Sequence, residues 1–498
     1  MRFLIVPPDV RPPTLQFPVS LARAAGLEVS TPPSEALPDL NKPGKFEVLK
    51  NWLLGHVRKA DTLILSLETL CLGGMIPARR VEDSFAEASG KLEFLRELKE
   101  KNPGLRIYAG GVVVRVAHGN DPLEEKTYYG EWGDALRDYS EWFDRAARSG
   151  KLEDKEQPEG AEAKVPKEIL DDWLATRQRN HQLHLKALEL TGEGVIDHLC
   201  LTLDDTSTYG LAAHDRRALE ARTDELGLWQ KVDIYPGADE VPATLLARAI
   251  QEKSSKVYVR YSGSLGAAAS LIFEDRSVGE LITAQLRAAR CIKVDTLAEA
   301  DFILAVNTPA IGQAEPQPNF ESVDTAARYL PSFVDFLERC LVDNIPVALA
   351  DIAYPNGAER RLMTLIDDLP LSRLAGYGAW NTAGNTLGGV IAMGVVSSRI
   401  KNRALWLEVL FNRFVDDYLY QAGVRAVVAG ELDGANPFDL GAQTAEAEHL
   451  VEEKMRPLAQ AFWNKHFAQE DVDLVWERSS LAWPRLFTGV FPFSVEEA

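Results

Sequence analysis

The alternation of short apolar runs with longer amphipathic stretches constrains the fold of this 498-residue chain more than any other feature. The apolar runs are rich in valine, isoleucine and leucine, which is typical of buried strands in parallel sheets. They lie at residues 2–7, 27–31, 62–67, 105–109, 198–203, 231–235, 256–261, 302–306, 347–350 and 374–379. Helical patterns separate them, as in Leu15 to Ala25, Phe46 to Lys59 and Val81 to Lys101. This order predicts βα units and an α/β fold.

Two architectures fit that pattern, and periodicity alone does not separate them. We expect a parallel-strand (β/α) barrel-like core with an inserted α/β portion and a helical C-terminal region. The alternative is two doubly wound domains in tandem. The predicted parts are residues 1–255, 256–395 and 396–498, because the pattern becomes helical after about residue 386. The tail from residue 426 carries much of the tryptophan and proline, and we expect it to wrap the main body.

A polar, acidic stretch over residues 150–167 contains proline and glycine and few apolar residues, so we interpret it as an exposed loop. A helix is predicted next, over residues 167–191. His181 and His184 would share a face of that helix, and we interpret both as solvated or capping side chains.

The charge balance excludes two classes of partner. The chain has 54 lysines and arginines against 74 aspartates and glutamates, a net charge of −20. So acidic a chain is repelled by nucleic acid and by anionic membranes. The N-terminal run lacks the longer apolar region and cleavage site of a signal peptide, and no window is apolar enough to span a membrane. We therefore expect a cytoplasmic protein that acts on a small molecule or oligosaccharide, with its oligomeric state left open.

Motifs for cofactors and metals are weak. Cys71, Cys200, Cys291 and Cys340 are widely spaced beside apolar runs, which predicts buried, reduced thiols. Gly263-Ser-Leu-Gly266 follows a strand and would open an Ala-rich helix, but it lacks the spacing of a dinucleotide loop and the lysine of a P-loop. Only eight histidines are scattered along the chain. We therefore predict no cofactor and no metal.

Polar side chains follow nearly every predicted strand. In both architectures chemistry collects at the carboxyl ends of parallel strands. The residues at these ends include Asp9, Arg11, Glu68, Arg115, Asp204, Asp205, Tyr209, Asp239, Glu240, Asn307, Asp351, Trp380, Asn381 and Asn385. We predict that Asp9, Arg11, Asp204, Asp205, Asp239, Glu240 and Asn381 face one cavity.

Two adjacent acidic pairs stand out among them. Asp204-Asp205 ends an apolar run, where mutual repulsion would push the two pKa values apart. Asp239-Glu240 opens a predicted helix, so the helix dipole gives this pair a structural role beside a catalytic one.

Several of these segments resemble a widespread bacterial family that is catalogued only as a domain of unknown function. The segments are Pro7-Pro-Asp9-Val-Arg11-Pro12, Asp204-Asp205 with Tyr209-Gly210, Tyr235-Pro-Gly-Ala-Asp-Glu240 and Trp380-Asn-Thr-Ala-Gly-Asn-Thr-Leu-Gly388. The resemblance covers essentially the whole chain and implies no activity.

Two local similarities point to chemistry. Asp204-Asp205 resembles the adjacent aspartates of O-GlcNAcase-like glycoside hydrolases, and Gly237-Ala-Asp239-Glu240 is similar to the Gly-Gly-Asp-Glu of β-hexosaminidases. Both families use (β/α)-barrel domains and substrate-assisted catalysis. The first resemblance implies that Asp205 is the general acid/base and that Asp204 orients the acetamido group, an order of roles that could be reversed.

The leading functional prediction is a glycoside hydrolase, possibly a substrate-assisted, retaining N-acetylhexosaminidase. Its catalytic candidates are Asp204, Asp205, Asp239 and Glu240, because glycoside cleavage needs a proton donor and a group that stabilises a cationic centre. Its substrate-binding candidates are Asp9, Arg11, Tyr209, Asn307, Trp380, Asn381 and Asn385.

Two other functions stay open. In one, Asp9, Asp204, Asp205 and Asp351 hold a divalent cation in a phosphohydrolase or transferase. In the other, the chain binds a sugar or metabolite without catalysis.

Overall fold

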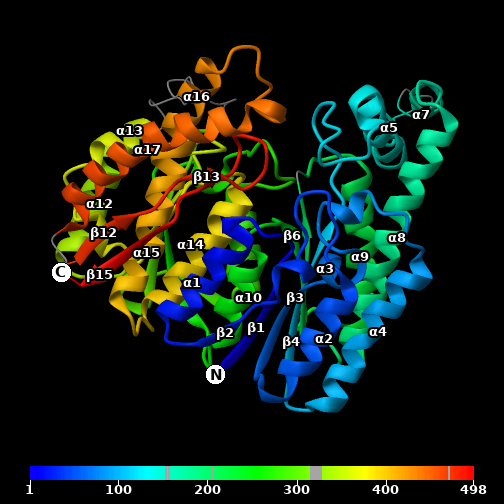
Figure 1. The fold of residues 1–498 in the computed structure, drawn as a ribbon, viewed down its shortest axis with the longest axis horizontal. Helices are drawn as coiled ribbons and strands as arrows, with labels where there is room; N and C mark the ends of the chain where they lie inside the picture. The colour runs from blue at the N-terminus through cyan, green and yellow to red at the C-terminus, as the bar shows by residue number, and fades with distance from the viewer. Residues whose placement is uncertain (152–153, 155–156, 205, 314–327, 469–471, 498) are drawn as a thin grey trace. The chain divides into compact units, whose positions relative to one another are not determined.

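The computed structural model describes residues 1–151, 154, 157–204, 206–313, 328–468 and 472–497 (Figure 1). The chain forms two compact units, each assembled from separate segments. The first unit comprises residues 1–10, 29–245 and 273–275, and the second comprises residues 11–28, 246–272 and 276–498. The units are therefore not consecutive stretches, and the predicted division into 1–255, 256–395 and 396–498 stays a prediction.

The first unit is built on a six-stranded sheet with the order β2-β1-β3-β4-β5-β6. The strands are β1 (Arg2–Val6), β2 (Glu28–Ser30), β3 (Thr62–Ser66), β4 (Arg106–Val113), β5 (His198–Leu203) and β6 (Val232–Pro236). All pairings from β1 through β6 are parallel, with Leu65 opposite Ala109 and Cys200 opposite Asp233. Every strand falls on a predicted apolar run.

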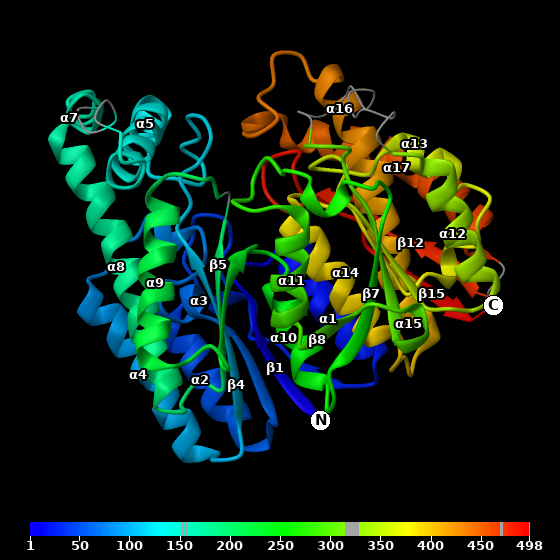
Figure 2. The same cartoon turned by 180° about the vertical axis from the view of Figure 1, so that it is seen from behind.

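Helices cover one face of this sheet. They include α2 (Phe46–His56), α3 (Leu67–Leu72), α4 (Phe85–Lys101), α8 (Lys167–Gly192) and α9 (Leu211–Leu226). Their apolar side chains form one core with alternate strand residues such as Leu65 and Leu201. Figures 1 and 2 both show α4, α8 and α9 lying along this face. Because side chains alternate along a strand, the other face carries a different set, including His198 and Cys200.

The helices of this unit correct two predictions. Both α5 (Tyr129–Arg148) and α7 (Gln157–Glu162) contribute to a small core of their own, with Tyr129 and Ala161 buried. The acidic stretch at 150–167, predicted as an exposed loop, therefore contains a helix, because a few apolar side chains suffice to dock it. His184 is also buried, at 3% exposure, rather than solvated.

The second unit is built on a five-stranded sheet with the order β11-β10-β9-β7-β8. The strands are β7 (Ser255–Tyr261), β8 (Cys291–Val294), β9 (Phe302–Asn307), β10 (Val347–Asp351) and β11 (Gly376–Gly378), and all pairings are parallel. The strand β8 was not predicted, because it is a short edge strand with Ile292 and Lys293 exposed.

Close packing against this sheet depends on glycine. A Cβ at Gly376 would lie 2.7 Å from Met393, and one at Gly378 would lie 2.8 Å from Val390, both in α14 (Ala383–Ser397). Figure 2 shows α11 (Val278–Ala288) and α14 in this unit. Tyr377, between the two glycines, stacks on Phe414 with ring centroids 4.0 Å apart. The Gly-Tyr-Gly sequence of β11 thus receives a helix on one face and an aromatic ring on the other.

The other helices of the second unit surround this core, and its C-terminal part adds strands to the predicted helices. The helices are α1 (Phe17–Ala24), α10 (Val241–Ile250, which begins in the first unit), α12 (Leu330–Val342), α13 (Arg360–Leu365), α15 (Arg403–Arg413), α16 (Arg425–Glu431) and α17 (Thr444–His466), with a π-helical segment at Phe414–Val424. Two antiparallel pairs follow, β12 (Val472–Trp476) with β15 (Phe493–Glu497) and β13 (Ser480–Leu481) with β14 (Gly489–Val490).

The predicted parallel α/β fold is confirmed. Five strands of the first sheet and all five of the second share the doubly wound order 2-1-3-4-5. These pairings show parallel sheets of six and five strands, and they do not show the closed barrel that was the first expectation. The four cysteines are buried and form no disulfide, as predicted. Within the described part of the chain, no helix has the length and apolar character needed to cross a membrane.

Candidate functional site

In a doubly wound sheet, ligands bind at the carboxyl ends of the strands, where the strand order reverses. In the first unit this reversal lies between β1 and β3. The loops that follow these strands are joined there, because the Thr69 hydroxyl donates to the Pro7 carbonyl and the Met75 N–H donates to the Pro8 carbonyl. Asp9, a predicted binding residue, lies in the same loop and is 2% exposed.

The buried carboxylate of Glu68 occupies this position. It accepts hydrogen bonds from the Val112 N–H at 2.7 Å and from the Ser66 hydroxyl at 3.1 Å, and it lies 3.4 Å from the His184 ring. The crevice beside it, with a volume of about 10 Å³, has room for about one water molecule. The reversal point of the first sheet is therefore filled by protein side chains.

A cluster of ion pairs lies next along the same edge. The guanidinium of Arg79 contacts Glu125 at 3.0 Å and Asp204 at 2.8 Å, and Arg115 contacts Glu124 at 3.0 Å and Glu125 at 2.9 Å. The Arg79 side chain is 3% exposed, whereas that of Asp204 is 14% exposed. Arg79 therefore fixes the position of the Asp204 side chain, close to solvent. Asp205 lies outside the described residues.

Beyond this cluster an open cavity of about 130 Å³ follows β4 and β5. Its walls come from the loop after β4, the loop after β5, helix α5 and the start of α9. The polar groups in the lining are a guanidinium, a carboxylate, an imidazole and hydroxyls. They belong to Arg137, Glu141, His118, Ser140, Ser207 and Tyr209. This lining offers both hydrogen-bond donors and acceptors to a small polar molecule.

Several contacts fix the wall of the cavity at Tyr209. The guanidiniums of Arg145 and Arg148 lie over the Tyr209 ring, 4.7 and 4.8 Å from its centroid. Next to it, the Gly210 N–H donates to Asp144 and the Leu211 N–H donates to the Ser140 hydroxyl, which satisfies the N-terminus of α9. Tyr209 is thus anchored by cations and lines the cavity.

The carboxyl edge of the second sheet is closed by a buried polar network. The Asn307 amide donates to Asp351 and to Glu359, both at 2.8 Å, and its carbonyl accepts from Arg328 at 2.8 Å. Arg328 and Glu359 form an ion pair at 2.6 Å, with side chains 0% and 2% exposed. The Asp351 carboxylate also accepts from the Glu359 N–H at 2.6 Å. These polar groups bond one another.

Burial shifts two carboxyl groups of the second unit. Desolvation, followed by the charge of Glu359, raises the pKa of Asp351 to about 7. Desolvation also raises the pKa of Asp417 to about 7, against the opposing effect of Arg413, and the Asp417 carboxylate accepts from the Ala379 N–H at 2.7 Å. Both groups therefore titrate near neutral pH inside the protein.

The Trp-Asn-Thr-Ala-Gly-Asn segment after β11 forms a turn that leads into α14. Asn381 has a φ of 61°, a left-handed conformation that asparagine tolerates. The Asn385 amide donates to the Thr382 hydroxyl at 3.1 Å, and the Thr386 hydroxyl donates to the Trp380 carbonyl at 2.8 Å. Trp380 is 4% exposed and contacts Phe487, so its ring packs inside the protein.

The predicted site residues fall into both units. Asp9, Asp204, Tyr209, Asp239 and Glu240 lie in the first unit, and Arg11, Asn307, Trp380, Asn381 and Asn385 lie in the second. Within the first unit, Asp204 and Tyr209 follow the same strand, whereas the buried Glu240 carboxylate accepts from the Ala238 N–H at 2.8 Å. Within the second, the Arg11 guanidinium lies over the Trp483 ring at 4.8 Å. A single shared cavity stays a prediction.

Several residues of these edges were missed by the sequence analysis. Arg79, Glu124, Arg137, Arg328 and Glu359 do not directly follow apolar runs, which was the signal used. The available signal was the presence of arginines in the sequence, because a buried carboxylate at a strand end needs a cationic partner from elsewhere in the chain. The sequence does not say which arginine that is. The Gly263–Gly266 segment also differs from expectation, because only a three-residue 3₁₀ turn begins at Gly266 in place of an Ala-rich helix.

Comparison with known families now adds one finding. The profile described as "Protein of unknown function (DUF4127)" matches residues 3–490. The chain belongs to this family. The expected membership in a family of unknown function is thereby confirmed, and this match does not show the resemblance to glycoside hydrolases.

No curated protein matches the chain. Among solved structures, a crystal structure from Mycobacterium smegmatis in complex with β-D-fucofuranose is similar at 12% sequence identity. The similarity covers 62% of this chain and 74% of that one, with a TM-score of 0.15. At that TM-score the similarity carries no argument about fold or ligand.

Proposed function

We propose that the first unit binds a small polyhydroxylated molecule, of about monosaccharide size, in the cavity after β4 and β5. The observation that carries this proposal is the cavity of about 130 Å³ at the carboxyl edge of a doubly wound sheet. A site of this volume holds several water molecules, and hence a compact polar ligand in their place.

The lining suits hydroxyl groups. A sugar hydroxyl both donates and accepts, and the cavity offers the Arg137 guanidinium as donor and the Glu141 carboxylate as acceptor. Each is held by an ion pair on α5, Arg137 with Asp134 at 3.0 Å and Glu141 with Arg145 at 2.5 Å. The mixture of charges disfavours a polyanion such as a nucleotide.

The second unit contains a larger cavity of about 220 Å³, lined by Pro12, Gln16, Phe17, Ser20, Glu408, Val409, Asn412, Glu477, Phe491, Pro492 and Phe493. No strand of either parallel sheet contributes to that lining, so the general rule for doubly wound folds favours the first cavity.

The experiment is ligand-observed NMR and calorimetry with a panel of hexoses, N-acetylhexosamines and sugar acids. Arg137→Met should weaken binding by about tenfold or more, because it removes a charge-assisted hydrogen bond. Arg96→Met is the matched control. Arg96 is 38% exposed against 34% for Arg137, and each forms a helical i,i+3 ion pair. If no member of the panel binds, or if both variants bind like the wild type, the proposal is wrong.

Cleavage of a glycoside by Asp204 and Asp205 remains the finer proposal. The contact between Asp204 and Arg79 supports the orienting role for Asp204, since a carboxyl group that an ion pair holds in place can position an amide. Release of the aryl group from aryl N-acetylhexosaminides tests it. Wild-type turnover that Asp205→Asn lowers by about 10²–10⁴ would support hydrolysis. Sugar binding without turnover would leave a binding protein.

A further inference from the structure

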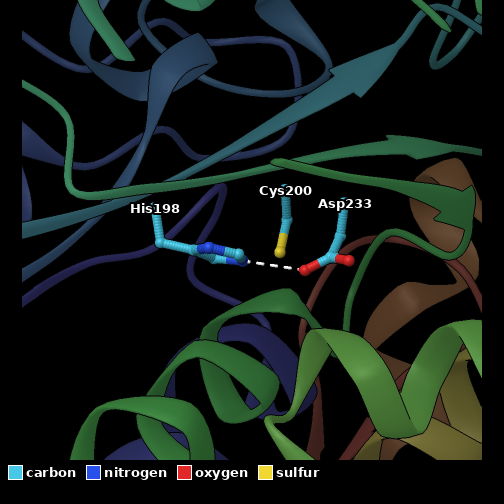
Figure 3. Close-up of side chains that lie close together, drawn as sticks. All are labelled: His198, Cys200 and Asp233. Atoms are coloured by element: carbon cyan, nitrogen blue, oxygen red, sulfur yellow. Dashed lines mark ion pairs between the residues drawn. The ribbon is translucent and has the colours of Figure 1, made fainter. Parts of the chain in front are cut away.

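A histidine, a cysteine and an aspartate meet on the face of the first sheet opposite its main helical layer (Figure 3). His198 and Cys200 are two residues apart on β5, so their side chains point to the same face. Asp233 on β6 lies directly opposite Cys200 in the parallel register. The three potential ligand atoms lie within 4.8 Å of one another, and the His198 Nε2 is 2.9 Å from the Asp233 Oδ2.

The cluster is buried inside the protein. His198 is 2% exposed, Cys200 0% and Asp233 3%. Burial of a carboxylate is costly unless positive charge compensates it. The neighbours of the cluster on the same sheet face include Tyr108 on β4, Thr202 on β5 and Tyr235 on β6. Arg106 lies two residues before Tyr108 on β4, and its guanidinium lies over the Tyr108 ring, 5.9 Å from the ring centroid.

We propose that His198, Cys200 and Asp233 bind a zinc ion. Imidazole nitrogen, thiolate sulfur and carboxylate oxygen are the three ligand types that zinc takes in proteins. One thiolate and one carboxylate neutralise Zn²⁺, so the bound site carries no net charge, which suits a buried position. The softer sulfur ligand disfavours magnesium and calcium, which take oxygen ligands.

Tyr235 provides a neighbour for the remaining position. It is fully buried beside the cluster, on the same strand as Asp233. Its hydroxyl can offer an oxygen to the ion or a hydrogen bond to a thiolate. The proposed zinc would link β5 to β6. Its first ligand, His198, is the first residue of β5, whereas the sugar cavity follows the last residue of β5. Zinc binding is thus independent of the proposed function.

The first experiment measures metal in the full-length protein. Elemental analysis after incubation with zinc and gel filtration should give one zinc ion per chain. Cobalt replaces zinc in such sites and reports its ligands by absorbance, so Co²⁺ addition should produce a thiolate-to-cobalt charge-transfer band. Absence of stoichiometric zinc and of this band in the wild type overturns the proposal, and the three residues are then a metal-free ion pair beside a thiol.

Variants test which residues bind the ion. Cys200→Ala should abolish the charge-transfer band, whereas Cys71→Ala, which removes another fully buried thiol from the same unit, should retain it. Asp233→Asn keeps the side-chain shape and should weaken zinc binding by more than the roughly 10–100-fold that loss of an outer-shell partner costs. Wild-type zinc affinity in both Cys200→Ala and Asp233→Asn contradicts the site. If Cys200→Ala does not fold, Asp233→Asn and the wild-type cobalt spectrum decide.

Discussion

The two units share a strand order and differ at the carboxyl edges of their sheets. In the first unit, ion pairs around Arg79 leave Asp204 partly exposed, and a cavity of about 130 Å³ follows β4 and β5. In the second, the buried side chains of Arg328, Glu359, Asn307 and Asp351 bond one another. The same placement of polar residues at strand ends therefore serves two purposes. At one edge the polar groups stay available to a ligand. At the other they bond to one another and stabilise the loops of that edge.

The largest expected effect is at the closed edge. Arg328→Met leaves the Glu359 carboxylate buried without its cation, and we expect a loss of about 3–5 kcal/mol in the free energy of unfolding of the second unit. Lys465→Ala, which breaks the exposed pair with Asp367, should cost at most about 1 kcal/mol. Chemical denaturation, with hydrogen exchange of β10 amides to report on this unit, measures both. Equal costs would mean that the buried network stabilises the second unit no more than an exposed ion pair does.

At the open edge the corresponding change should cost less. Arg79→Gln removes ion pairs from Glu124, Glu125 and Asp204, but Arg115 still contacts the two glutamates and Asp204 is near solvent. We expect a loss of about 1–3 kcal/mol in the first unit, measured by hydrogen exchange of β5 amides. A cost above that of Arg328→Met would contradict the distinction between the edges.

The raised pKa of Asp417 predicts a pH dependence in the second unit. Its pKa rises from 3.8 to about 7 on folding, so between these values the folded protein binds more protons than the unfolded chain. The stability from this group is fully present below pH 3.8 and is lost as the pH rises through about 7.

Asp417→Asn removes this titration. The difference in unfolding free energy, wild type minus variant, should therefore fall between pH 4 and 7 by on the order of 1 kcal/mol or more. Parallel denaturation curves over this pH range test the expectation. A constant difference would show that Asp417 does not titrate there.

The smallest expected effect is that of Asp204→Asn. It weakens one contact of Arg79, which keeps Glu124 and Glu125, so the stability cost should stay below about 1 kcal/mol. Thermal unfolding measures it. A much larger cost would mean that Asp204 stabilises the fold, as Arg328 and Glu359 do in the second unit. It would weaken the assignment of Asp204 to a substrate site.

Much of the sheet architecture was available from local sequence. Runs such as 62–67 and 347–350 are mostly apolar, as expected of strands buried on both faces, and both are interior strands. The edge strand β8 was missed because its exposed Ile292 and Lys293 break that pattern. The helix α7 was missed because its docking rests on Ala161 within an acidic stretch.

The site was less predictable. Placement after a strand correctly found Asp204, Asn307 and Asp351 as edge residues, yet it did not distinguish the partly exposed Asp204 from the buried Asn307 and Asp351. Trp380 and Tyr209 were both predicted to bind the substrate. Trp380 is buried, and the Tyr209 ring is already covered by two guanidiniums.

The sequence by itself determined the parallel α/β class, the buried thiols and the polar strand ends, because these follow from the period and composition of single segments. Only the tertiary structure decided which strand pairs with which, and so which charges meet. Arg79 is 125 residues from Asp204, and Asp233 joins His198 and Cys200 across two strands. Such contacts depend on strand order and register, which local sequence patterns do not encode. They decide whether the polar groups at the edge of a sheet are buried against one another or stay open to a ligand.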